Sequence, residues 1–136
     1  MLAVAGRYRI QSELIPAIAT GFCGGMARTS TRLCGAYTGG IMAIGLRLGR
    51  KEPEASHDDC YAACQRFYAA FMDRFKSETC PRLLGCDLAT KEGQHEFETR
   101  DLISSICIPI TETATTLVME AIEAIEMRQA TGLKST

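Results

Sequence analysis

Cysteine is the residue type that sets this sequence apart, because seven of its 136 residues are cysteines. A cysteine thiol can form a disulfide, bind a metal ion or an iron–sulfur cluster, or fill an apolar core. The cysteine count is odd, and the N-terminal stretch MLAVAGRYRIQ has only a four-residue apolar run, which makes a poor export signal. A secreted disulfide framework is therefore not expected. We interpret the chain as a cytoplasmic protein whose thiols have redox, ligand or structural roles.

Three of the cysteines are predicted to stand at or near the start of a helix. Cys34 begins a segment rich in small residues, Cys80 directly precedes a proline, and Cys107 lies near the start of the last predicted helix. The unpaired amides and partial positive charge of a helix N-terminus stabilise a thiolate. Arg32 and Arg82, two residues from Cys34 and Cys80, add the same bias. We therefore predict Cys34, Cys80 and Cys107 as catalytic thiols, with plain core packing as the alternative.

The other cysteines differ in setting. Cys86 is close enough in sequence to Cys80 to share a ligand set, whereas Cys60 and Cys64 lie one helical turn apart on an apolar seam and are expected in the core. No Cys-x-x-Cys occurs, which argues against a zinc finger, a thioredoxin-type pair or a c-type haem site. Distant cysteines that the fold must gather suit an iron–sulfur cluster or a disulfide better. The candidate metal ligands are Cys34, Cys80, Cys86 and Cys107.

The stretch GFCGGMARTSTRLCGAYTGG, residues 21–40, surrounds two of the cysteines with glycine. Gly24, Gly25 and Gly35 can expose backbone amides and leave room for a ligand or a partner thiol beside Cys23 and Cys34. The candidate cofactor-binding residues are therefore Cys23, Gly24, Gly25, Gly35 and Cys86. Glycine costs about 1 kcal/mol against alanine inside a helix, so the later glycines of this region indicate close helix packing or a dimer interface.

All the segments that must position these residues are predicted to be helices, and the predicted fold class is all-α. Apolar residues recur at three- and four-residue steps, most clearly in the seam of Phe67, Phe71 and Phe75. No alternating pattern indicates a sheet. We expect a compact bundle of about five to six helices in one domain, residues 1–130, with a disordered tail at 131–136. The predicted helices are 10–20, 34–48, 56–76, one beginning at 81, 92–105 and 109–128.

The amino-acid composition argues against nucleic acid and membranes as partners. The net charge is −1, which gives no reason to expect nucleic acid, and no stretch reaches the roughly 18 to 20 uncharged apolar residues of a membrane span. The glycine and alanine face of the 34–48 helix favours a homodimer. His57 and His95 have no evident orienting partner, so a hydrolase or transferase is a distant alternative.

Three stretches together resemble a known family: GFCGGMARTSTRLCGAYTGGIMAIGL, FYAAFMDRFKSETCPRLLGCDL and CIPITETATTLVMEAI. They are similar to the small helical proteins named for a C_GCAxxG_C_C pattern and for redox activity. The resemblance implies that Cys34, Cys80 and Cys107 correspond to cysteines of that pattern. For the first cysteine of the pattern two alternatives stay open: Cys23 substitutes for it, or a native N-terminal segment carries it. The family also looks similar to the cluster-bearing part of split-Soret cytochromes c, which implies a two-iron, two-sulfur cluster as one cofactor; their haem-attachment motif is lacking here.

Two hypotheses of different classes follow. The first is a redox or electron-transfer protein with an unknown redox partner, in which the thiols ligate an iron–sulfur cluster or interchange between dithiol and disulfide. The second is a helical module for oligomerisation or small-ligand binding, in which the cysteines are only buried apolar residues.

Overall fold

The computed structural model describes residues 1–29 and 33–132. The described part of the chain is helical and contains no strand, only an isolated bridge between Leu33 and Thr79, so the all-α prediction is confirmed. The elements are α1 (Leu2–Arg7), α2 (Leu14–Ala19), η1 (Thr20–Phe22), α3 (Cys23–Arg28), α4 (Gly35–Leu48), α5 (Asp58–Phe75), α6 (Cys80–Leu84), α7 (Lys91–Thr99), η2 (Ile103–Cys107) and α8 (Ile108–Ala130). Arg32 and the end of the predicted tail, 133–136, lie outside the described residues.

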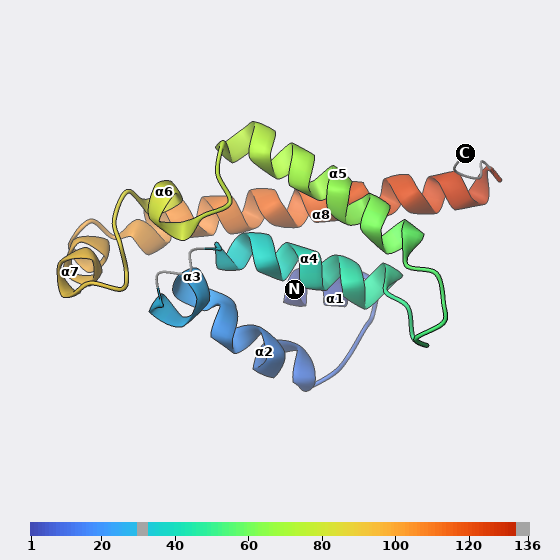
Figure 1. Cartoon of the computed structure of the whole chain (residues 1–136), viewed down its shortest axis with the longest axis horizontal. Helices are drawn as coiled ribbons and strands as arrows, with labels where there is room; N and C mark the ends of the chain where they lie inside the picture. Colours follow the sequence, from blue (N-terminus) through green and yellow to red (C-terminus); the bar gives the residue numbers. More distant parts are fainter. Residues whose placement is uncertain (30–32, 133–136) are drawn as a thin grey trace.

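The core lies where α4, α5 and α8 run along one another (Figure 1). The phenylalanine seam of α5 faces inward as predicted, because Phe67 and Phe71 have no exposed surface. Their rings meet edge to face with centroids 5.6 Å apart, and α8 contributes Val118 and Ile122 to the same core. Burying side chains of this size stabilises a fold by about 1.5–3 kcal/mol each, which makes this three-helix contact the main source of stability.

A smaller core closes one end of the molecule. Figure 1 shows α6 and α7 beside the beginning of the last helix, away from the C-terminal end of α8. Leu84, Leu88 and Leu102 are buried there together with Cys80 and Cys86. Two of the seven thiols are therefore part of an apolar cluster that is separate from the phenylalanine core.

The segment before the last helix differs from the prediction, whereas α8 itself begins at Ile108, close to the predicted 109. The polar helix ends at Thr99 rather than 105, and the π-helical segment η2 runs directly into α8. The physical reason is Pro109, which has no amide hydrogen and crowds the carbonyl four residues before it. A π-helical turn just before the proline relieves this conflict without ending the helix. Cys107 is the N-cap residue of α8, so its predicted place near the start of the last helix is confirmed, but the π-helical segment continues directly into that start.

The glycine pair of the 21–40 region forms a left-handed turn. Gly24 and Gly25 have φ values of 66° and 71°, and the positive values continue through Met26 and Ala27. Non-glycine residues in this conformation cost about 1–2 kcal/mol each, so the surrounding contacts must hold the turn in place. The sequence indicated a loop here and gave no sign of its handedness.

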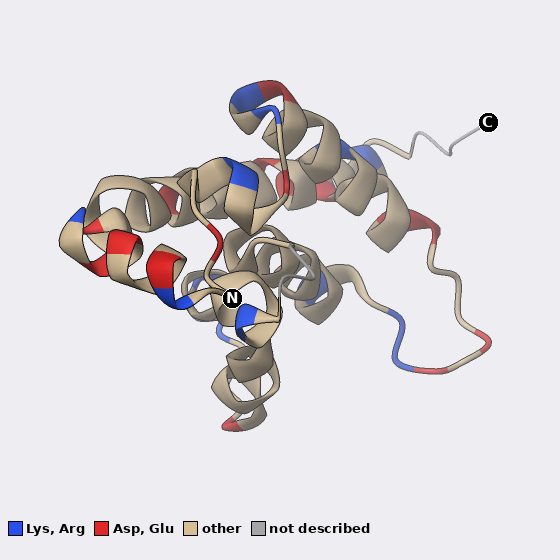
Figure 2. Cartoon of the chain, turned by 60° about the vertical axis from the view of Figure 1, so that its left-hand side comes forward, with Lys and Arg blue, Asp and Glu red and all other residues tan. Residues whose placement is uncertain are grey.

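Charged residues are distributed over the outside of the helices and along the loop between α4 and α5 (Figure 2). Two ion pairs connect elements of the main core: Arg47 with Glu126 joins α4 to α8, and Arg128 with Asp59 joins α8 to α5, both at 2.5 Å. One segment, Ile103–Ala130, is long and apolar enough to cross a membrane by length and composition, as core helices of soluble proteins can also be.

The packing of α4 on α5 gives the first testable prediction. A Cβ atom on Gly40 would lie 2.5 Å from the ring of Phe67, whereas a Cβ on Gly45 of the same helix would meet nothing within 4 Å. We expect Gly40→Ala to lower the free energy of unfolding by about 1–3 kcal/mol through overpacking. Gly45→Ala should raise it by up to about 1 kcal/mol through helix propensity. Urea unfolding of both variants checks this, and an equal response of the two would contradict the packing.

Candidate functional site

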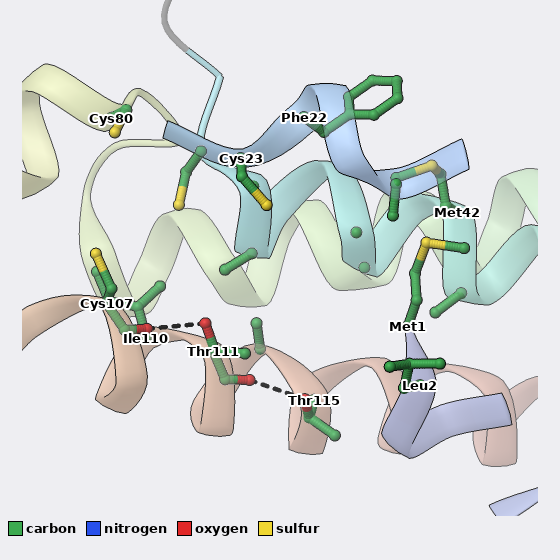
Figure 3. Close-up of a pocket in the computed structure, with 18 of the residues that line it drawn as sticks. Met1, Leu2, Phe22, Cys23, Met42, Cys80, Cys107, Ile110, Thr111 and Thr115 are labelled. Carbon is green, nitrogen blue, oxygen red and sulfur yellow. Dashed lines mark hydrogen bonds between the residues drawn. The ribbon is translucent and has the colours of Figure 1, made fainter. Parts of the chain in front are cut away.

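An apolar cavity of about 530 Å³ lies between α1, α2, α4 and α8 and reaches α3 and α6 at one end. Four cysteines line it: Cys23, Cys34, Cys80 and Cys107. Figure 3 shows Cys80 and Cys107 at the same end of this cavity, each sulfur directed into the space between α6 and the last helix. The three predicted catalytic thiols, which are far apart in the sequence, therefore share one cavity.

Cys34 is held beside the segment that leads into α6. It is the N-cap residue of α4, and its backbone amide donates a hydrogen bond of 2.8 Å to the carbonyl oxygen of Glu78. The preceding residue, Leu33, forms the antiparallel bridge to Thr79. In such a pair, positions 34 and 80 are diagonal neighbours on one face, roughly 7–8 Å apart at the backbone. The two cysteines are thus brought together by main-chain hydrogen bonding.

Cys80 is the first residue of α6 and is only 8% exposed. The left-handed turn covers it: a Cβ on Gly25 would lie 2.9 Å from the Cβ of Cys80 and 3.5 Å from its sulfur. The absence of a side chain at position 25 is therefore what lets α3 approach the thiol. Gly35 has a similar role, because a Cβ there would lie 3.0 Å from the backbone oxygen of Phe22.

Cys107 is half-buried at the end of η2. Its carbonyl oxygen accepts a hydrogen bond of 2.8 Å from the hydroxyl of Thr111, one turn further along α8 (Figure 3). This bond, with the π-helical turn before it, fixes the backbone from which the thiol enters the cavity.

Burial controls the protonation of these thiols. It raises the pKa of Cys80 to about 12, with further contributions from the charges of Cys34, Cys107 and Cys86, in that order, and of Asp87. Burial likewise raises the pKa of Cys107, followed by the charges of Cys34 and Cys86. The expectation of thiolates stabilised by helix starts is therefore wrong for Cys80 and Cys107. Removal of the charge from water outweighs the helix dipole, and Arg82 is exposed to solvent.

The same electrostatic couplings show which sulfurs are neighbours. After burial, the charge of Cys34 is the next cause that raises the pKa of both Cys80 and Cys107, so the Cys34 sulfur lies near both. Cys86 is buried in the smaller core behind Cys80 and does not line the cavity. Cys23 lines the cavity from α3 and is exposed to solvent.

The thiols do not form a ready metal site as they are placed. Within residues 1–29 and 33–132, no three side chains of His, Cys, Asp or Glu group closely enough to hold a metal ion. The donor chemistry of Cys34, Cys80, Cys86 and Cys107 suits an iron–sulfur cluster, but their spacing does not fit one without movement. The two-iron, two-sulfur cluster and its ligand set stay predictions.

The remaining candidates lie elsewhere. Cys60 and Cys64 are half-buried and pack against the main core, as expected, and burial followed by its neighbour Cys60 raises the pKa of Cys64 to about 11. His57 and His95 are exposed, and His57 packs on Tyr61 with ring centroids 4.2 Å apart.

Sequence reasoning missed the apolar wall of the cavity. It includes Leu2 and Met42 at the end opposite to Cys80 and Cys107, and Phe22 of η1 (Figure 3). A cavity is bounded by residues that share no period along the chain, so no sequence signal marks it.

Fold and site together define a small all-helical protein with a group of thiols on the wall of an apolar cavity. The chain belongs to the family described as "Putative redox-active protein (C_GCAxxG_C_C)", whose model matches residues 1–121. No curated protein and no solved structure matches the chain. The family assignment confirms the resemblance seen in the three cysteine-containing stretches.

The contact between the left-handed turn and Cys80 gives a second prediction. Gly24 and Gly25 both have positive φ, so alanine is strained at either position. At Gly25 the new Cβ also meets the backbone-proximal Cβ of Cys80, whereas at Gly24 its nearest contact is the flexible Arg28 side chain at 3.3 Å. We expect Gly25→Ala to be less stable than Gly24→Ala by about 1–2 kcal/mol in urea unfolding. Equal stabilities would show that Cys80 is not tightly covered.

The protonation of Cys80 gives a third prediction. Its raised pKa means that the neutral thiol is favoured in the folded state, so little thiolate is present until the pH approaches about 12. At pH 8 we expect iodoacetamide to modify Cys80 about a thousandfold more slowly than an ordinary thiol of pKa about 8.5, since only the thiolate reacts. The rate should rise about tenfold per pH unit between pH 8 and 11. Peptide mass spectrometry measures it, with exposed Cys23 as the internal reference, and equal rates for the two would contradict the burial.

Proposed function

We propose that this protein is a thiol–disulfide exchange protein in which Cys34 and Cys80 interchange between dithiol and disulfide. The observation that carries the proposal is the meeting of Cys34, Cys80 and Cys107 from three different elements on one cavity wall. The redox activity in the family description agrees with it. A helical packing module has no need to direct three thiols into open space.

The backbone pairing favours Cys34 and Cys80 as the exchanging pair. The bridge between Leu33 and Thr79 keeps their segments adjacent, and disulfide formation requires Cα atoms within roughly 7 Å. The diagonal spacing of such a pair is at this limit, so a small approach of α6 towards α4 is sufficient. Cys107 is the alternative partner, because the charge of Cys34 also raises the pKa of its thiol.

Cys34 is the attacking thiol, since it is half-buried whereas Cys80 is almost fully covered. The Cys34 thiol loses its proton and attacks one sulfur of a substrate disulfide, and the other substrate sulfur leaves as a thiolate and takes up a proton. Cys80 then loses its proton, attacks the sulfur of Cys34 and releases the second substrate thiol. The protein loses two electrons and two protons to form one disulfide, and the substrate gains both to become two thiols.

The coupling between the two thiols assists the second step. After burial, the charge of Cys34 is the next cause that raises the pKa of Cys80. Once Cys34 is bonded in the mixed disulfide, this charge is gone. The pKa of Cys80 is then lower than beside a Cys34 thiolate, although burial, the larger cause, still raises it. The second step is therefore assisted mainly by the proximity of the two sulfurs.

The iron–sulfur alternative remains a second proposal, supported by the donor chemistry of the four candidate ligands but requiring them to move closer. Exchange of this kind suits a reducing compartment such as the cytoplasm.

The glycine face of α4 that favoured a homodimer is partly engaged within the chain, where Gly40 packs on Phe67. We also propose that the protein acts with a redox partner and forms a homodimer.

The test is a thiol count on the reduced protein before and after treatment with hydroxyethyl disulfide. We expect the wild-type protein to lose two thiols and two mass units, with the new bond mapped between Cys34 and Cys80. Cys34→Ala should form no disulfide between cavity thiols and react only at exposed Cys23, whereas Cys80→Ala should also accumulate the mixed disulfide on Cys34. Cys60→Ala, which alters a thiol outside the cavity, should behave as wild type.

Other outcomes are equally informative. A bond mapped between Cys34 and Cys107 would move the exchange to the second pair. Unreactive cavity thiols, or stoichiometric iron and sulfide in protein prepared without oxygen, would overturn the exchange proposal.

A further inference from the structure

The cavity extends well beyond the thiols. Its far end is formed by Leu2 of α1 and Met42 of α4, at the other side of Figure 3 from Cys80 and Cys107. A volume of about 530 Å³ lies within the range of small-molecule sites, which is about 300–1,000 Å³. Exchange between two thiols alone needs no such space, so the volume indicates a substrate with a body that fills it.

The side chains on the cavity wall carry no charge. Met1, which lines the cavity, also carries the α-amino group of the chain, and burial lowers the pKa of this group. Among the described residues that line it, none is Asp, Glu, Lys, Arg or His. The only side-chain hydroxyls on the wall are those of Thr111 and Thr115, and both donate to backbone oxygens of their own helix, at 2.8 Å each. A charged substrate would therefore lose its hydration without receiving a side-chain partner in return, which costs several kcal/mol. Since burial favours the neutral form of the Met1 amino group, that group offsets little of this cost.

We propose that the substrate is an uncharged, mainly aliphatic disulfide, whose sulfur atoms lie at Cys34 and whose chain occupies the cavity between α1, α4 and α8. This rests on the proposed exchange function and adds the substrate class to it. The electron balance is the one given above: the aliphatic disulfide gains two electrons and two protons and leaves as thiols. Disulfides of charged peptides, with carboxylates and ammonium groups, are poor substrates.

The glycine at position 39 offers a way to fill the cavity without disturbing the thiols. Gly39 lines the cavity, and a Cβ there would meet only the Met1 side chain, at 4.0 Å. Gly39→Leu therefore places a side chain in the cavity. Gly45→Leu is the matched control, because it is on the same helix, has open space around its Cβ and does not line the cavity.

The experiment compares two disulfides of one chain length. They are the disulfide of mercaptobutanoate, which has a carboxylate at each end, and its neutral dimethyl ester. The rate of protein disulfide formation is followed by mass spectrometry, and each rate is divided by the rate of free mercaptoethanol with the same disulfide. We expect the normalised rate of the ester to exceed that of the dicarboxylate by at least about tenfold, equivalent to 1.4 kcal/mol or more.

The variants test whether the preference comes from the cavity. Gly39→Leu should bring the ester rate within about threefold of the dicarboxylate rate, and Gly45→Leu should keep the wild-type ratio. Leu2→Lys, at a 63% exposed position on the cavity wall, should raise the dicarboxylate rate, whereas Leu14→Lys, 65% exposed and outside the cavity, should not. Because Leu2 and Leu14 are exposed, these two variants fold even if Gly39→Leu does not.

The outcomes separate the two proposals. Equal normalised rates for the two disulfides, or a preference unchanged in both Gly39→Leu and Leu2→Lys, would overturn the substrate class while leaving exchange intact. Failure of the wild-type protein to react with either compound or with hydroxyethyl disulfide would overturn exchange itself, and the substrate class with it.

Discussion

The short backbone pairing between residues 33–34 and 78–79 is the constraint on which the site depends. The bridge of Leu33 with Thr79 and the hydrogen bond from Cys34 to Glu78 join the start of α4 to the start of α6, although more than forty residues and the whole of α5 lie between them in the chain. Main-chain hydrogen bonds of this kind contribute about 1 kcal/mol each, and they are directional. They therefore fix the positions of two thiol-bearing residues more closely than apolar contact alone does.

Two opposing effects act on the thiols brought together in this way. A charge at a helix N-terminus is stabilised by about 0.3–1 kcal/mol, and only within the first turn. Removing a charge from water costs several kcal/mol, and at Cys80, which is 8% exposed, this larger effect raises the pKa to about 12. A deeply placed thiol that stays neutral is protected from oxidants in bulk solution.

The sequence was sufficient where one local pattern decides the structure. The seam of Phe67 and Phe71 predicted α5 and its buried face, and the starts of α4 and α6 were predicted at Cys34 and beside Pro81. It was insufficient where two local rules compete. Pro109 reads as a helix start, yet a π-helical turn before it allows the helix to continue. Met26 is a residue type that rarely adopts a positive φ, and here it directly follows the glycine pair whose Gly25 packs on Cys80. The cavity, which is formed by several elements, has no counterpart in any single segment.

Helix α4 connects the fold to the proposed chemistry because its small residues serve two faces. On one face Gly40 lets the ring of Phe67 approach to 2.5 Å of where a Cβ would be, which brings α4, α5 and α8 into close contact. On the neighbouring face Gly35 and Gly39 line the cavity and leave its space open. A larger residue on the first face would separate the core helices, and one on the second would fill the cavity. The cost of placing glycines in a helix, about 1 kcal/mol each, is therefore offset on one side by packing and accepted on the other for the sake of the site.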